Sequence, residues 1–335
     1  MQLAATFGDG NLLEGDHALP RTGIFQILVC RTSHSLGNTL FITPLMQEIQ
    51  EQWPGAEVDL VVRFGGAKQI FGSYRNLRRI FHLPKQTIHH PVEAIKALYQ
   101  MRATHYDLAI DTDLRSRTGR LLLILSRARY KVGFSGRGKL THEVALDGAP
   151  KHAGHFPVFL LRKALGLKTG NCPLLSTQLT QGEMQQGWES LDRVRGPLPK
   201  NKLGVVGVFA NATGPKKMSQ EWWREFMSEI EPHLASYCII EIIPAFGRSM
   251  LGSRYPAYFS SNIRNLSQFL SGLTMLISLD CGIMHLARAS GTAVGAVFTT
   301  TDVDQWGPYG PGAFFVKGDR EHPAEAARQL MNEFR

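Results

Sequence analysis

Short apolar segments alternate with amphipathic ones along the sequence, and the pattern occurs twice. In the first half, the apolar runs include "IFQILVC" (24–30), "EVDLVVR" (57–63) and "YDLAIDTD" (106–113). In the second half, the corresponding runs are "LGVVGVFA", "YCIIEIIPA", "TMLISLD" and "TAVGAVF". Strands that alternate with helices predict a parallel, doubly wound sheet. We therefore expect an α/β protein with one such sheet in each half.

The length of the chain also predicts two domains. Its 335 residues exceed the size at which single hydrophobic cores usually stop growing. Region 171–203 has a helical centre between flanks that contain Pro and Gly, so we place the link between the domains there. The expected parts are a polar N-terminal extension (1–23), a Rossmann-like domain (24–170), the linker (171–203), a second Rossmann-like domain (204–320) and a C-terminal helix (321–335).

Two of the expected helices have informative ends. The pattern "NTLFITPLMQEIQEQW" contains Pro44, so this helix either kinks there or begins near Thr43. The pattern "SQEWWREFMSEIEPHL" predicts a helix capped by Ser219. We expect Trp222 and Trp223 of that helix to pack in the core rather than to form a stacking platform.

The formal net charge of +9 favours an anionic partner, although a need for solubility would also explain it. Positive residues gather in 115–139. This segment lacks the repeated aromatic residues of proteins that bind single strands, and no nucleic-acid motif is visible. We therefore expect a phosphate-bearing small molecule or a lipid as the partner, and no nucleic acid.

The sequence predicts no transmembrane helix, because no window of about 18 uncharged apolar residues occurs. Residues 1–23 also lack the apolar core of a signal peptide. The four cysteines form no C-x-x-C pair, so neither a disulfide framework nor a zinc site is indicated. They are Cys30, Cys172, Cys238 and Cys281. A reducing cytoplasm is the expected location.

The most specific stretch is "LISLDCGIMHLARASGTAVGAVFTTTDVDQWGPYG" in the second half. Asp280 ends a predicted strand, Gly282 opens a helix, and His285 follows five residues after the aspartate. A helix N-terminus presents free N–H groups and a positive dipole, which suits a diphosphate, and Lys216 could add a point charge. The alternative is an ordinary helix cap by Asp280 with a core histidine.

This stretch resembles glycosyltransferase family nine, the heptosyltransferases of lipopolysaccharide core assembly, which typically show D-[ST]-G-x-x-H-[LI]-A. The first half agrees, because "RTSHSLGNTLFITPL" (31–45) resembles the family's R-x-x-x-x-G-D-x-L-x-x-T-P. The segment "KKMSQEWWREF" is similar to its K-x-W-x-x-E-x-[FW]. The resemblance runs in order from about residue 24 to residue 320.

The resemblance implies a GT-B fold, with two doubly wound Rossmann-like domains facing across a cleft and the last helix packing back toward the first domain. It implies an inverting, metal-independent glycosyltransferase. The enzyme would move heptose or a related sugar from a nucleotide diphosphate donor, with ADP-heptose as a candidate, to a lipopolysaccharide core or other anionic glycan. No cofactor and no metal are expected. The expected location is cytoplasmic, with peripheral contact to the inner membrane.

The resemblance also suggests binding residues. The donor diphosphate would lie at the N-terminus of the helix that begins near Gly282, surrounded by Lys216, Asp280, Cys281, Gly282 and His285. An anionic acceptor would lie on the first domain, where Arg suits bidentate phosphate contact. The candidates are Arg63, Lys68, Arg115, Arg117 and Arg120, and the alternative is a solvated basic face.

Three departures from the family pattern keep a second function open. Asn38 stands where the family usually has aspartate, and Cys281 stands where a hydroxyl usually meets phosphate. The loop "AFGRSMLGSRYPAYFSSN" has no acid, whereas members that use ADP-heptose tend to carry a glutamate there. The chain is therefore either a transferase with another donor or a catalytically weak or inactive nucleotide-sugar-binding relative.

The departure at Asn38 raises the question of the catalytic base. An amide cannot accept the proton of an acceptor hydroxyl, and His34 lies nearby in the same loop. Asp113 replaces a position that is often glutamine in the family, and it follows the strand "YDLAID". The first and fourth strands of a doubly wound sheet lie side by side, so we expect the loops of Asn38 and Asp113 to be neighbours.

We therefore hypothesise that the carboxylate has moved to Asp113 and that Asn38 positions the acceptor. The alternative is that Asp113 caps a turn and the enzyme is slow or inactive. The D-x-D sequences at 111–113 and 302–304 resemble those of metal-dependent glycosyltransferases, but we expect strand-end turns there and no metal.

Overall fold

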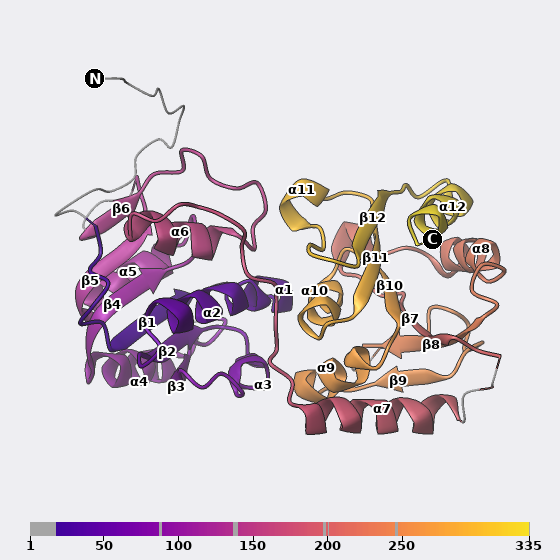
Figure 1. Cartoon of the computed structure of the whole chain (residues 1–335), viewed down its shortest axis with the longest axis horizontal. Coiled ribbons are helices and arrows are strands. Elements are labelled where there is room, and N and C mark those ends of the chain that lie inside the picture. Colours follow the sequence, from indigo (N-terminus) through magenta and orange to yellow (C-terminus); the bar gives the residue numbers. More distant parts are fainter. Residues whose placement is uncertain are drawn as a thin grey trace, which may run out of the picture. The chain divides into compact units, whose positions relative to one another are not determined.

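The chain folds into two compact units (Figure 1). The computed structural model describes residues 18–334 except 87–88, 137–139, 197–198, 200 and 245–246. The first unit comprises the described residues up to Lys68 and from Tyr74 to Pro173. The second comprises Gln69–Ser73 and the chain from Leu174 onward.

The first unit is built on a six-stranded parallel sheet in the order β3-β2-β1-β4-β5-β6. Its strands are β1 (Gln26–Arg31), β2 (Glu57–Val62), β3 (Leu77–His82), β4 (His105–Asp111), β5 (Arg127–Phe134) and β6 (His142–Val144). Its helices are α1 (Leu36–Leu40), α2 (Thr43–Gln52), α3 (Ala67–Phe71, at the boundary of the two units), α4 (Pro91–Arg102), α5 (Arg117–Leu125) and α6 (Phe156–Ala164). The strand order reverses between β1 and β4, where Cys30 pairs with Asp111.

The second unit repeats this topology with a six-stranded parallel sheet in the order β12-β11-β10-β7-β8-β9. The strands are β7 (Gly204–Phe209), β8 (Tyr237–Ile243), β9 (Ala257–Phe259), β10 (Met275–Leu279), β11 (Ala293–Phe298) and β12 (Ala313–Lys317). The helices are α7 (Gln181–Arg195), α8 (Gln220–Ile230), α9 (Ile263–Ser271), α10 (Gly282–Ala289), α11 (Val303–Trp306) and α12 (Pro323–Glu333), and a 3₁₀ helix spans Gly214–Lys216. Here the order reverses between β7 and β10.

The helix features predicted from the sequence are confirmed. The helix containing Pro44 begins at Thr43, which leaves the proline at a helix start where its missing N–H costs nothing. Ser219 caps α8 by accepting a hydrogen bond from the backbone N–H of Trp222 (3.1 Å). Trp222 and Trp223 are both buried in the core of the second unit.

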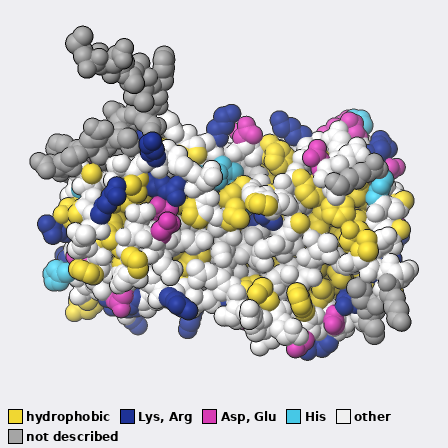
Figure 2. Space-filling model, viewed as in Figure 1, with side chains coloured by type: hydrophobic (Ala, Val, Ile, Leu, Met, Phe, Trp, Pro, Cys, Tyr) yellow, Lys and Arg dark blue, Asp and Glu magenta, His cyan; other side chains and the backbone are white. Residues whose placement is uncertain are grey.

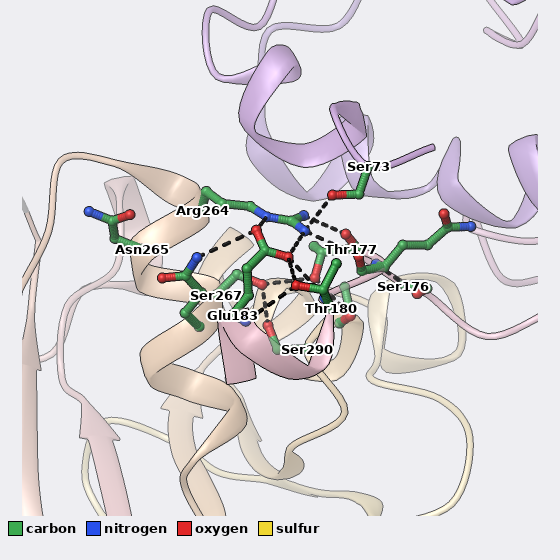
Figure 3. A network of polar contacts seen from close by, with 12 residues as sticks. Ser73, Ser176, Thr177, Thr180, Glu183, Arg264, Asn265, Ser267 and Ser290 are labelled. Atoms are coloured by element: carbon green, nitrogen blue, oxygen red, sulfur yellow. Dashed lines mark hydrogen bonds and ion pairs between the residues drawn. The ribbon is translucent and has the colours of Figure 1, made fainter. Parts of the chain in front are cut away.

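Polar contacts join the first part of region 171–203 to the second unit. Arg264 on α9 forms an ion pair with Glu183 on α7 (2.6 Å) and donates to the carbonyl of Thr177 (2.5 Å), as Figure 3 shows. The Thr177 hydroxyl contacts that of Ser267 (2.8 Å). Hydrogen bonding to Arg264 lowers the pKa of Glu183 to about 2, so the pair stays charged. Residues 197–198 and 200 of this region lie outside the described residues.

Buried side chains hold both ends of the described chain. The last helix, α12, packs on α8, β11 and β12 of the second unit, where Ala327, Leu330 and Met331 complete that unit's core. Within the expected N-terminal extension, Leu19 is buried and donates its backbone N–H to the carbonyl of Ala164 (2.8 Å). The rest of the expected extension, 1–17, lies outside the described residues.

Candidate active site

A lysine and an aspartate meet where the strand order of the second sheet reverses. Lys216 ends the 3₁₀ helix after β7, and Asp280 follows β10. These strands are neighbours, so their following loops meet, and Lys216 Nζ lies 2.6 Å from Asp280 Oδ2. The Thr301 hydroxyl donates to the same oxygen. The Asp280 side chain is 8% exposed and that of Lys216 is 29% exposed, so the lysine remains reachable from solvent.

The N-terminus of α10 begins directly after this pair. Cys281 is the N-cap residue, with extended backbone (φ −158°, ψ 169°), and Gly282 is the first helical residue. Burial raises the pKa of the Cys281 thiol to about 11, although the N–H groups of Met284 and Ile283 oppose the shift. The thiol is therefore neutral at pH 7. The helix end presents backbone N–H groups beside Lys216 without a competing negative charge from the cap.

The alternative to a diphosphate site was a helix cap by Asp280 together with a core histidine at position 285. Asp280 does not cap the helix, because its carboxylate binds Lys216 and Thr301 instead. His285 is buried on α10. Its burial agrees with a core histidine, whereas the Lys216 side chain is 29% exposed.

The loop after β8 is organised by an acid that the sequence interpretation missed. Glu241 lies within β8, is fully buried, and accepts hydrogen bonds from the Ser249 hydroxyl (2.5 Å) and from the backbone N–H groups of Met250 (2.7 Å) and Leu251 (3.2 Å). The loop itself contains no acid, and Ala245 and Phe246 lie outside the described residues. Glu241 therefore holds the loop's shape and is not exposed to a ligand.

The reversal point of the first sheet brings Asn38 and Asp113 together, as predicted. Arg31, the last residue of β1, forms an ion pair with Asp113 (3.2 Å). It also donates to the side-chain amide oxygen of Asn38, Oδ1 (3.2 Å). Asp113 also accepts from the backbone N–H (2.7 Å) and the hydroxyl (2.8 Å) of Thr32. The Asn38 amide group donates to the Ser33 hydroxyl (2.9 Å), so both ends of the amide are fixed.

Known proteins resemble this chain in sequence and in fold. The model of glycosyltransferase family 9 (heptosyltransferase) matches residues 260–333, which include the helix that begins at Gly282. Lipopolysaccharide heptosyltransferase 1 of Escherichia coli K12 is 23% identical over 92% of this chain and 98% of its own length. In sequence, the chain is therefore similar to the heptosyltransferases of glycosyltransferase family 9.

Solved structures agree with this fold. A family 9 glycosyltransferase from Veillonella parvula has a TM-score of 0.77 at 16% identity, covering 95% of this chain and 100% of the other. The heptosyltransferase WaaC of Escherichia coli with ADP-2-deoxy-2-fluoro heptose has a TM-score of 0.69 at 19% identity, covering 93% and 100%. The two parallel six-stranded sheets form a GT-B fold, as the sequence predicted.

A second buried acid of this glycosyltransferase was missed by the sequence interpretation. Asp111, the last residue of β4, is buried, and its Oδ1 accepts the backbone N–H of Asp113 (3.2 Å). Burial, and then the charge of Asp113, raise the pKa of Asp111 to about 7. Only glycine fits at position 119, because a Cβ there would lie 2.3 Å from Asp111 Oδ1.

The proposed acceptor residues fall into two groups. Lys68, Arg115 and Arg117 are exposed, and Arg63 is half-buried and donates to the Thr118 hydroxyl (3.4 Å). Arg120 is buried: it donates to the Phe134 carbonyl and pairs with Glu143 (3.4 Å), so its assignment to the acceptor is wrong. Arg120 was a candidate because it lies near the start of a predicted helix, but its side chain is buried. His34 is exposed in the loop between β1 and α1.

The D-x-D sequence at 302–304 has the structural role expected of it. Asp302 caps α11 by accepting the backbone N–H of Asp304 (3.0 Å). Among the described residues, no group of three or more His, Cys, Asp or Glu side chains is arranged to hold a metal ion. Within the same part of the chain, no helix is long and apolar enough to cross a membrane.

Proposed function

We propose that this glycosyltransferase moves heptose or a related sugar from a nucleotide diphosphate donor to a lipopolysaccharide core or a similar anionic glycan. We further propose that transfer proceeds with inversion and without a metal ion. The observation that supports this most is the Lys216–Asp280 pair beside the N-terminus of α10 (2.6 Å). The similarity to lipopolysaccharide heptosyltransferase 1 supports the choice of sugar and acceptor.

The donor end of the reaction needs charge stabilisation. A departing nucleoside diphosphate gains negative charge, and preorganised N–H groups and a cation stabilise it without reorganisation during the reaction. Lys216 supplies the cation, and Gly282 lets the backbone N–H groups of α10 approach the phosphates. Asp280 holds Lys216 in place, and Thr301 orients Asp280.

The acceptor end needs a base. We assign that role to Asp113 and a positioning role to Asn38, whose amide is held between Arg31 and Ser33. Inverting transfer then takes the proton from the acceptor hydroxyl as the sugar carbon is attacked, a contribution of about 10²–10⁴ in rate. Lys68, Arg63, Arg115 and Arg117 are the remaining candidates for contact with acceptor phosphates, and His34 remains a minor candidate near the base.

One observation favours a second candidate, a catalytically weak or inactive nucleotide-sugar-binding relative. Arg31 and the N–H and hydroxyl of Thr32 are all directed at the Asp113 carboxylate. These donors compete with an acceptor hydroxyl for the oxygen lone pairs of Asp113. A chain with Asn38 and a fully engaged Asp113 could therefore bind the donor and turn it over slowly.

A two-stage experiment separates the candidates. A thermal-shift screen over nucleotide diphosphate sugars first identifies the donor, because a ligand of the folded state raises the melting temperature. That donor is then incubated with truncated lipopolysaccharide, with and without EDTA, and the product is analysed by mass spectrometry and by NMR of the anomeric centre. We expect an EDTA-resistant mass gain of one sugar with inverted configuration. Donor binding without any transfer would support the second candidate instead.

A further inference from the structure

Helix α4 of the first unit has an apolar stripe that faces solvent. Val92, Ile95 and Tyr99 lie at helical spacing and are 76%, 65% and 76% exposed. The same helix buries Ala97 and Met101 in the core of its own unit. A surface helix needs one apolar side for its core, so the second apolar side of α4 requires another partner.

Helix α5 extends the stripe. Leu121 and Ile124 on α5 are 53% and 40% exposed. The two helices are neighbours, because Arg102 at the end of α4 donates to the carbonyl of Leu125 at the end of α5, and both helices pack on the same core. Figure 2 shows hydrophobic and basic side chains, with a few acidic ones among them, on the visible face of the first unit. We call Val92, Ile95, Tyr99, Leu121 and Ile124 the α4/α5 face.

The charged residues around the α4/α5 face are almost all positive. Lys96 on α4, Arg117 on α5, and Arg127 and Arg129 directly after α5 are exposed. The sequences of the two helices contain a single acidic residue, Glu93, which lies 3.5 Å from His90. These cations therefore lie on the same helices as the apolar side chains or directly after α5.

We propose that the α4/α5 face docks the protein on the surface of an anionic lipid bilayer. Apolar side chains can enter the boundary between headgroups and acyl chains, while neighbouring Lys and Arg bind anionic headgroups. Tyr99 suits this boundary because its ring is apolar and its hydroxyl is polar. A second copy of the chain fits less well, since a twofold contact would bring like charges together. This docking does not depend on the proposed transfer reaction.

Vesicle flotation tests the proposal with the purified full chain. We expect binding to vesicles of phosphatidylglycerol and phosphatidylcholine, little binding to phosphatidylcholine alone, and release as salt rises. The double variant Ile95→Ser/Tyr99→Ser should bind at least about tenfold more weakly, because each change removes apolar area that enters the bilayer. The variant Lys96→Glu/Arg127→Glu should lose binding at low salt, by roughly fivefold or more for each charge. All changed side chains are exposed, so melting temperatures should stay the same.

The matched control is Leu203→Ser, which removes a side chain that is 74% exposed on the second unit, and it should bind like the unchanged protein. Absence of binding to anionic vesicles would overturn the proposal. Equal loss in Leu203→Ser and in the α4/α5 variants would also overturn it. The face would instead be an interface between two copies if two results occur together. The unchanged protein and the control would sediment as dimers but the α4/α5 variants as monomers, and the protein would not bind vesicles.

Discussion

The two sheets place a cation and a carboxylate at the same topological position but surround them differently. In the second unit, the Lys216 side chain is 29% exposed and its partner Asp280 has one further donor, Thr301. In the first unit, Arg31 and Asp113 are 8% and 14% exposed, and Thr32 and Asn38 join the pair. The same reversal of strand order thus supports an accessible cation in one unit and a closed hydrogen-bond network in the other.

This difference follows from the residue types. The guanidinium of Arg31 is planar and reaches Asp113, Asn38 and the Thr112 carbonyl at once, so it joins two loops. The ammonium of Lys216 is a point charge on a flexible stem and can leave Asp280 for a phosphate. We therefore expect changes in the first network to affect both chemistry and stability, and changes in the second to affect mainly donor binding.

The largest expected effect concerns the carboxylate in the first network. Asp113→Asn should lower the rate of transfer by about 10²–10⁴, because it removes the proposed base, while donor affinity should change little. Initial rates and calorimetric donor titration measure the two quantities. Asn38→Asp, assayed beside it, restores an acid at the family's usual position. If Asp113→Asn keeps full activity, or if Asn38→Asp alone turns over, the base has not moved to Asp113.

The second prediction compares the stability of the two pairs. Arg31→Met should lower the free energy of unfolding by about 3 kcal/mol, because it leaves a largely buried carboxylate without its cation. Lys216→Met should lower it by less than about 1 kcal/mol, since Lys216 is partly exposed. Urea unfolding followed by circular dichroism measures both. If both variants lose similar free energy of unfolding, the two ion pairs contribute equally to stability and the comparison is wrong.

The third prediction concerns the pH dependence of the first unit. The folded protein keeps the proton on Asp111 up to about pH 7, whereas an unfolded chain releases it near pH 4. Asp111 therefore contributes stability that is complete below about pH 4 and is lost as pH rises to about 7. Between about pH 5 and pH 7, the unchanged protein should lose roughly 2 kcal/mol relative to Asp111→Asn. Urea unfolding at each pH measures the free energy of unfolding of both proteins. If this free energy changes equally with pH in the two proteins, Asp111 does not have this role.

The smallest expected effect is a gain at the cap of α10. Cys281→Ser supplies a hydroxyl oxygen that accepts an N–H bond at the helix start and can donate to a phosphate. We expect about 0.5–1 kcal/mol of added stability and donor binding that is a few-fold tighter. Differential scanning fluorimetry and donor titration test this. A weaker donor complex would mean that the thiol fits the bound donor better than a hydroxyl.

The sequence predicted most of the longer strands and helices, although α6 (Phe156–Ala164) and β12 (Ala313–Lys317) were not expected. It missed β6 (His142–Val144) and β9 (Ala257–Phe259), which have three residues each and cannot show a period. Strand order follows from the fold class, and it predicted that the loops of Asn38 and Asp113 would meet.

The site could be predicted in part for similar reasons. The spacing of "DCGIMH" and the lysine before α8 located Lys216 and Asp280, and these residues do pair. Side-chain direction was not predictable, so Arg120 looked like a surface cation and is buried, and Glu241 was not recognised as the acid that orders the donor-side loop. Asp111 was missed because its properties depend on burial, which the residue pattern does not show.

The most direct test of the central claim is the contribution of Lys216 to diphosphate binding. Isothermal titration of the unchanged protein, Lys216→Ala and the adjacent control Lys217→Ala should use ADP and adenosine, or the corresponding pair for the donor found by screening. We predict that Lys216→Ala weakens diphosphate binding by roughly 10–100-fold, as expected for a charge-assisted contact. Nucleoside binding and the control should be unchanged. Equal loss for the diphosphate and the nucleoside, or no loss for either, would contradict the assignment of the donor site.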